Sequence, residues 1–237
     1  MQGALRIYAA VCFAIFVSGC GGGNNMSAPT ISNFDLQTGV TKMLSNGLSS
    51  NVSLSGTVSV NGVSTPFTGS GTLTKAPAVG ATFNGTAAMA QTTTVAGNIT
   101  VAGQTSPYST SVTDYYASSD SALLGEVSGS EYDVAQSPLL FPTSVMGGSS
   151  GTLGTLSRYT DSTMGVSLGT AQVSYFVMTP VDPGSPIGLV LTTKIYGTQN
   201  TLNETDTTNY TMTSSDVISF SGASAQNQSD TLTITAQ

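Results

Sequence analysis

Five acidic residues lie close together near the middle of the chain and form its densest group of cation ligands: Asp114, Asp120, Glu126, Glu131 and Asp133. Calcium takes six to eight oxygen ligands from carboxylates and carbonyls, and the neighbouring Gly/Ser-rich segments could supply the carbonyls. The spacing does not fit an EF-hand loop, because the chain contains no D-x-[DN]-x-[DN]-G pattern. Solvated loop acids are the competing interpretation. We therefore predict no metal site and keep these five residues as the calcium candidates.

A serine motif and the absence of histidine bear on catalysis. Residues 147–151 match the G-x-S-x-G pattern that surrounds the nucleophile of many hydrolases. That chemistry needs a base to take the serine proton, and the chain has no His and no Lys three residues after a Ser. We therefore interpret the motif as a flexible loop and predict no enzyme, no catalytic residue and no cofactor. A carboxylate-based enzyme is the alternative, and it requires Asp114, Glu126, Glu131 or Asp133 to converge in one cleft.

The first twenty residues have the plan of an export signal. Arg6 precedes an apolar run over 7–17, and small residues then lead to Cys20. The apolar run is shorter than the about 20 residues that a transmembrane helix needs. Val17-Ser18-Gly19-Cys20 resembles the lipobox of bacterial lipoproteins, in which an aliphatic residue and two small residues precede the modified cysteine.

The lipobox resemblance implies cleavage between Gly19 and Cys20, a diacylglycerol on the Cys20 sulfur and acylation of the new amino group. It divides the chain into a signal peptide at 1–19, a lipidated cysteine with a flexible tether at 20–30, and a body at 31–237. Cys20 is then the membrane anchor. Gly21 stands where an Asp would resemble the inner-membrane retention signal, so the expected location is the outer membrane of the cell envelope.

Composition limits the functions of the body. Only 7% of the 237 residues are charged, and acids outnumber bases by 12 to 5, which excludes nucleic acid as a partner because no basic patch can form. The two cysteines both lie in the first twenty residues, so the body has no disulfide. Its stability must come from packing and from strand ladders.

A repeat of 17 residues, 54–70 and 95–111, indicates how the body folds. In each copy apolar residues alternate with hydroxyl or other small residues, and Asn61-Gly62 or Ala102-Gly103 follows as a hairpin turn. Pro66 and Pro107 come early in the returning strand, a position typical of an edge. Because the matched positions are turn and packing residues, we predict a duplicated β-hairpin rather than a duplicated binding site.

The remaining body shows the same two-residue period. Runs at 171–178 and 187–196 are partly apolar on both faces, and the turn residues 181–186 between them predict an antiparallel pair. Further strands are predicted near 81–93, 108–117, 131–135, 152–160, 202–212, 217–221 and 231–235. No window of the body has a convincing helical stripe with caps. We predict an all-β body, an antiparallel sandwich or a barrel-like meander of hairpins, after a signal-peptide helix. A division into lobes 31–116 and 117–237 stays open.

These features favour a non-enzymatic, membrane-anchored interaction module that engages an envelope protein or another envelope component. Tyrosines recur along the strands and suit either strand formation or a binding face: Tyr115, Tyr116, Tyr132, Tyr159, Tyr175, Tyr196 and Tyr210. The second hypothesis is a carrier of a lipid or other apolar ligand inside a curved sheet or barrel. Uncharged, Thr-rich strand edges with few Lys residues also predict self-association.

Overall fold

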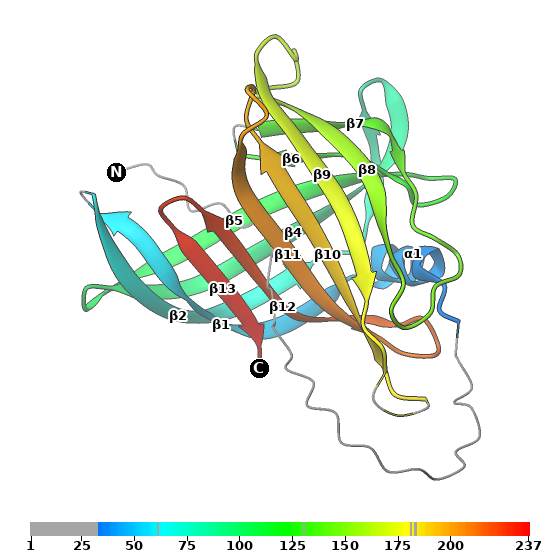
Figure 1. Ribbon diagram of the computed structural model, residues 1–237, viewed down its shortest axis with the longest axis horizontal. Coiled ribbons are helices and arrows are strands. Elements are labelled where there is room, and N and C mark those ends of the chain that lie inside the picture. Colours follow the sequence, from blue (N-terminus) through cyan, green and yellow to red (C-terminus); the bar gives the residue numbers. More distant parts are fainter. Residues whose placement is uncertain (1–32, 61, 130, 181, 183) are drawn as a thin grey trace.

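The structure is a computed structural model that describes residues 33–237 except 61, 130, 181 and 183, so the predicted signal peptide, Cys20 and the tether lie outside the described residues. One helix, α1 (Leu36–Asn46), precedes thirteen strands (Figure 1): β1 (Leu48–Val60), β2 (Val63–Lys75), β3 (Val79–Phe83), β4 (Thr86–Val101), β5 (Gln104–Ala117), β6 (Leu123–Ser128), β7 (Glu131–Leu139), β8 (Ser150–Tyr159), β9 (Ser167–Val177), β10 (Ile187–Tyr196), β11 (Leu202–Met212), β12 (Ile218–Asn227) and β13 (Thr231–Ala236).

Twelve of these strands form a closed antiparallel barrel. This confirms the all-β prediction and, of the sandwich and the barrel that the prediction left open, selects the barrel. The wall closes because β1 pairs with β13 and β2 pairs with β4. β3 lies outside the ring and pairs with residues 86–90 of β4, beyond the part of β4 that pairs with β2. Closure removes most free strand edges, and edges are where chains aggregate. Self-association is therefore expected at the edge of β3, and it stays a prediction.

Strand alternation points apolar side chains into the barrel and hydroxyls outward. In β13, Leu232 and Ile234 are buried while the intervening threonines are more accessible, as predicted. In β10, Ile187, Leu189 and Ile195 share the inner face. Each such side chain stabilises the fold by about 1.5–3 kcal/mol. The core of this protein is thus the barrel interior.

The sequence repeat corresponds to two neighbouring hairpins, so its structural interpretation is confirmed. The copies form β1–β2 and β4–β5, which lie side by side because β2 pairs with β4. Gly62 and Gly103 both have a φ of 78° in two-residue turns. Pro66 precedes the β2–β4 ladder and Pro107 precedes the β5–β6 ladder, so each has a paired strand on one side only, as predicted.

Two repeated glycines within the strands are also explained by packing. A Cβ on Gly56 would collide with the carbonyl oxygen of Thr231 in β13, and a Cβ on Gly97 would collide with that of Ser70 in β2. Gly56 also has a φ of 157°, which favours glycine. Neighbouring backbones therefore approach more closely at these two positions than any side chain allows.

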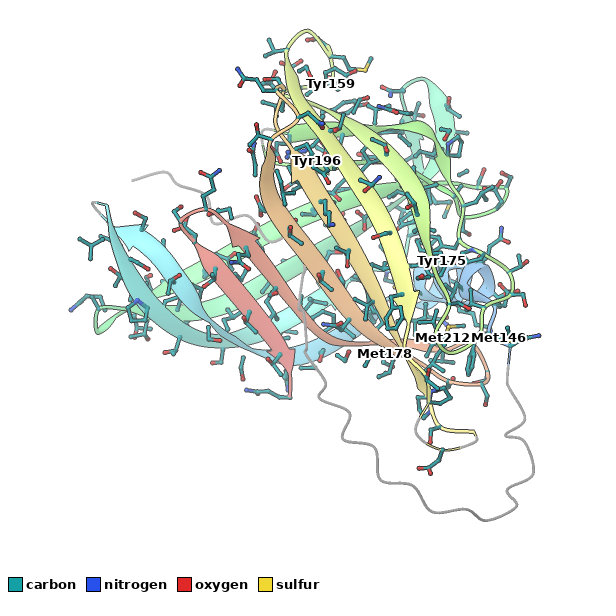
Figure 2. The ribbon with its side chains drawn as sticks, in the orientation of Figure 1. Met146, Tyr159, Tyr175, Met178, Tyr196 and Met212 are labelled. Carbon is teal, nitrogen blue, oxygen red and sulfur yellow. The ribbon has the colours of Figure 1, made fainter. Side chains whose placement is uncertain are left out.

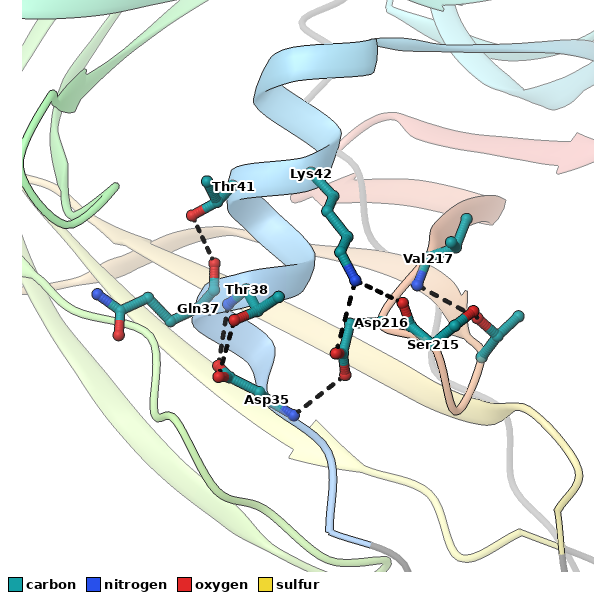
Figure 3. Close-up of polar contacts among 9 residues, drawn as sticks. Asp35, Gln37, Thr38, Thr41, Lys42, Ser215, Asp216 and Val217 are labelled. Atoms are coloured by element: carbon teal, nitrogen blue, oxygen red, sulfur yellow. Dashed lines mark hydrogen bonds and ion pairs between the residues drawn. The ribbon is translucent and has the colours of Figure 1, made fainter.

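The expectation of a body without a helix was wrong, because α1 is a well-formed helix that fills one end of the barrel. Its buried residues follow the helical period: Leu36, Gly39, Val40, Met43 and Leu44. Asp35 caps the N-terminus, and its Oδ1 accepts a hydrogen bond from Thr38 N at 2.9 Å (Figure 3). Glycine and threonines lower the helix propensity of this segment, and burial of the apolar stripe overrides them.

Polar contacts fix α1 to the loop between β11 and β12 (Figure 3). Lys42 Nζ donates to the Ser215 carbonyl oxygen at 2.6 Å and lies 3.7 Å from Asp216 Oδ2. Asp35 N donates to Asp216 Oδ1 at 3.4 Å. On another side, Gln37 Nε2 donates to the Asp120 carbonyl oxygen at 2.7 Å. The helix is therefore held by loops that follow widely separated strands.

The barrel has two different ends. All loops that contact α1 lie at one end, which we call the helix end. The opposite, hairpin end carries the tight connections β1–β2, β4–β5 and β6–β7, and the loops β8–β9, β10–β11 and β12–β13. Figure 2 shows Tyr159 and Tyr196 toward the hairpin end, and Tyr175, Met178 and Met212 toward the helix end.

Some strand predictions need correction. The strand predicted near 81–93 is interrupted, because Asn84 and Gly85 have positive φ and form the turn between β3 and β4. The strand predicted near 217–221 extends to Asn227. The antiparallel pairing predicted around 181–186 is confirmed by β9 and β10. Strands on both sides of the lobe boundary near residue 117 belong to the same sheet.

Candidate functional site in the barrel lumen

The barrel encloses a cavity of about 170 Å³ between α1 and the strands. Val40 and Met43 of α1 line it, together with inward side chains from β2 and from β4 to β12. Most of the lining is apolar, and Leu123, Leu153 and Leu191 are examples. An eight-stranded barrel is filled by its own side chains or holds one small ligand, so a wider, twelve-stranded barrel can keep open space even with a helix inside.

Lys75 and Asp114 form an ion pair in the cavity wall. Lys75 Nζ lies 3.2 Å from Asp114 Oδ2, and their side chains are only 11% and 13% exposed. Burial lowers the pKa of Lys75, but Tyr210, Asp114 and Glu126 outweigh that effect, and the net pKa lies above the ordinary lysine value. Because Tyr210 is itself a neutral phenol at neutral pH, Asp114 is the partner that keeps Lys75 charged there.

Two tyrosines surround this ion pair. Tyr116 Oη donates to Asp114 Oδ2 at 3.4 Å. Burial raises the pKa of the Tyr116 phenol well above its ordinary value, and Asp114 raises it further. Burial likewise raises the pKa of Tyr210. Both phenols therefore act as neutral hydrogen-bonding groups beside the ion pair.

A second buried ion cluster is centred on Arg158 of β8. Arg158 Nη2 lies 2.7 Å from Glu131 Oε1, and Arg158 Nε donates to Asp133 Oδ2 at 3.1 Å. The arginine is 5% exposed and the two acids are 4% and 2% exposed. The register places these residues together, because Asp133 of β7 is directly opposite Arg158 of β8. A guanidinium held by two carboxylates makes a rigid, desolvated arrangement.

Glu126 of β6 lies between the two ion clusters. Its register partners are Asp114 in β5 and Asp133 in β7. Burial raises the pKa of Glu126 well above its ordinary value, and the charges of Asp114 and Asp133 raise it further, whereas Lys75 and Arg158 lower it. Glu126 Oε1 is buried and accepts no hydrogen bond. Glu126 is therefore a carboxyl group of the cavity wall that has a raised pKa and one buried oxygen without a hydrogen-bond partner.

Asp206 of β11 is a further carboxyl in the interior, 1% exposed. Burial raises its pKa well above the ordinary value, and Glu204 two residues away raises it further. Neither carboxylate oxygen of Asp206 has a hydrogen-bond partner among the described residues. Two neighbouring carboxyls repel each other when both are ionised, which agrees with the raised pKa of Asp206.

Four of the five calcium candidates meet in the lumen: Asp114, Glu126, Glu131 and Asp133. The fifth, Asp120, lies at the helix end, where its Oδ1 accepts from Ala122 N at 3.1 Å. Three of the four lumenal acids are already engaged by Lys75 or Arg158. Among the described residues no group of acids has the arrangement of a metal site.

The serine motif and the tyrosines that the sequence singled out do not come together in one site. Ser149 of the G-x-S-x-G motif precedes β8, and its Oγ accepts from Met146 N at 3.0 Å. A strand rather than a helix follows, so the segment is not a nucleophile elbow. Tyr115 and Tyr132 stack on Phe83 with ring centroids 4.5 and 5.1 Å apart, in a cluster apart from the cavity lining. The tyrosines along the strands therefore do not form one continuous face.

Sequence reasoning missed Lys75 and Arg158 as lumenal residues. Both stand at inward positions at the ends of apolar, alternating runs, because Leu73 precedes Lys75 by two residues and Leu156 precedes Arg158 by two. A charged residue that continues an apolar face is the signal that could have placed them. Only the register could then show which acids they meet.

Comparisons with known proteins add no assignment. No protein-family model, no curated protein and no solved structure matches this chain. Within the part of the chain that the structure describes, no helix has the length and apolar character needed to cross a membrane.

Proposed function

We propose that this protein is a non-enzymatic, membrane-anchored envelope protein that carries a small, mainly apolar ligand inside its barrel. The observation that supports the proposal best is the cavity of about 170 Å³, which apolar side chains line and the closed wall surrounds. One water molecule needs about 10–15 Å³ of such volume, so the cavity could hold on the order of ten water molecules. A short aliphatic or aromatic ligand fits that space.

The distribution of polar groups also supports a lumenal site. Small-ligand sites are mostly apolar and contain a few convergent polar groups that fix orientation. Here Lys75, Asp114, Glu126 and Tyr116 supply such groups on one side of the cavity. The outward positions of β1, β2 and β13 carry mainly Ser and Thr.

The anchor belongs to the same proposal. Lipidation of Cys20 would place the tether directly before α1, at the helix end of the barrel. The helix end would then face the membrane, and the hairpin end would face away from it. A ligand would in that arrangement exchange at the hairpin end, since α1 and its loops fill the other.

Calorimetric titration with 1-octanol tests the carrier proposal. The full chain with Cys20→Ser keeps every described residue and lacks the predicted diacylglycerol on the sulfur. Leu191→Trp places a large side chain in the cavity and is expected to weaken octanol binding about tenfold or more, since the ring occupies the ligand's space. Val190→Trp is the matched control, because the next residue of β10 lies on the opposite face.

Saturable octanol binding that Leu191→Trp removes and Val190→Trp retains would support a lumenal carrier. Absence of binding, or equal binding by both variants, would contradict it. The second candidate, an interaction module that binds an envelope protein, would then become the better proposal. Crosslinking of the anchored chain in cells would identify that partner.

A further inference from the structure

We propose that the lumenal ligand carries a protonated amine, and that Glu126 is the residue that binds it. This inference rests on the proposed carrier function and specifies its ligand class. The site consists of Glu126 with Thr93 beside the Lys75–Asp114 and Arg158–Asp133 ion pairs. The ligand would place its apolar body against the leucines of the cavity and its ammonium group at Glu126.

The lumen contains more acidic than basic side chains. Among the described lumenal residues, the acids Asp114, Glu126, Glu131 and Asp133 surround two bases, Lys75 and Arg158. Glu204 and Asp206 add two further carboxyls on the face of β11 that also presents Thr208 and Tyr210 to the cavity. This excess of acids attracts a cation and repels a fatty-acid carboxylate.

Two buried hydrogen-bonding atoms of the cavity lining lack partners. Glu126 Oε1 and Thr93 Oγ1 are buried, have no hydrogen-bond partner and belong to residues that line the cavity. Buried polar atoms are nearly always paired in folded proteins. A ligand with an N–H donor beside Glu126 would give its Oε1 the partner that it lacks.

Other classes of ligand fit this region less well. A carboxylate ligand would need a free cation, but Lys75 pairs with Asp114 and Arg158 pairs with Glu131 and Asp133. Calcium would need six or more oxygens, whereas most lumenal carboxylates are committed to those two bases. An ammonium needs an acceptor carboxylate, and Glu126 has a buried oxygen without a partner.

The protonation of Glu126 agrees with this role. Burial, Asp114 and Asp133 raise its pKa, which favours the protonated form in the unliganded protein. An ammonium group favours the ionised carboxylate, and binding would release that proton to solvent. Lys75, Arg158, Tyr116, Tyr210, Glu131 and the Glu204–Asp206 pair also face this region, and the first two already offset part of the negative charge.

The experiment compares three ligands of equal chain length on the full chain with Cys20→Ser: octylamine, 1-octanol and octanoate. Octylamine is charged at neutral pH, as a lysine side chain is. A charge-assisted hydrogen bond to a buried carboxylate should make octylamine bind about tenfold or more tightly than octanol, and octanoate should bind more weakly. In Glu126→Gln the preference for the amine should disappear, while octanol binding should remain.

The outcomes separate the two proposals. Octanol binding without a preference for octylamine, or a preference unchanged in Glu126→Gln, would overturn the amine site and leave the carrier function standing. Tighter binding of octanoate would overturn it as well. Failure of all three ligands to bind would overturn both. Asp182→Asn, at an exposed loop position, converts a carboxyl group to an amide outside the lumen and should keep the preference.

Discussion

Replacement of Arg158 by Met should strongly destabilise the barrel. The substitution leaves Glu131 and Asp133 without the guanidinium that now lies 2.7 and 3.1 Å from them. Removal of one partner of a buried ion cluster costs about 3–5 kcal/mol. For a chain of this length, each kcal/mol lowers the melting temperature by about 2–4 °C, so the expected loss is roughly 6–20 °C at neutral pH.

Urea unfolding measures the loss in free energy of unfolding. Circular dichroism and tyrosine fluorescence follow the transition, since the chain has no Trp. Lys42→Met is the control, since the Lys42–Asp216 pair is 42% and 24% exposed, and loss of a surface pair costs at most about 1 kcal/mol. Adding Glu131→Gln and Asp133→Asn to Arg158→Met should recover much of the loss. If Arg158→Met costs no more than Lys42→Met, Arg158 does not hold the lumen together as described.

Three further predictions concern protonation, wall closure and anchoring. The raised pKa of Glu126 means that the folded chain keeps a proton that the unfolded chain releases above about pH 4.3. The free energy of unfolding therefore falls as the pH rises from there toward the raised pKa, and Glu126→Gln should reduce this fall. Urea midpoints of wild type and Glu126→Gln that change equally between pH 4, 6 and 8 would contradict this. Gly97→Ala forces a Cβ against the backbone of β2 and should cost about 1–3 kcal/mol, whereas Gly80→Ala, with open space around it, should cost little; equal melting temperatures for the two variants would refute the close approach. A labelled fatty acid fed to cells should be incorporated into the wild-type chain and not into Cys20→Ala, and equal labelling of the two would rule out lipidation at this cysteine.

The hairpins were the most predictable part of the fold. Alternation and turn residues act over a few neighbouring residues, so the repeated glycines and Asn61-Gly62 were enough to predict two equivalent hairpins. The Asn84-Gly85 turn was missed because apolar residues on both sides of it continue the strand pattern. The helix was missed although Asp35 and the spacing of Leu36, Val40 and Met43 signalled it.

The lumenal site was only partly predictable. The sequence brought attention to Asp114, Glu126, Glu131 and Asp133 as a group, but not to the basic residues that pair with them. Arg158 lies 25 residues from Asp133 along the chain, and only the antiparallel register of β7 and β8 makes them neighbours. Closure of the wall depends on pairings such as β1 with β13, which no local pattern specifies.

Native mass spectrometry of the full chain, extracted from membranes in a detergent that is released in the gas phase, shows whether the lumen carries a ligand. The wild-type protein should retain a small bound molecule, Leu191→Trp should lose it and Val190→Trp should keep it. The released molecule should be apolar and basic. A wild-type protein that carries no bound mass, or a bound mass that Leu191→Trp retains, would contradict a ligand-carrying lumen.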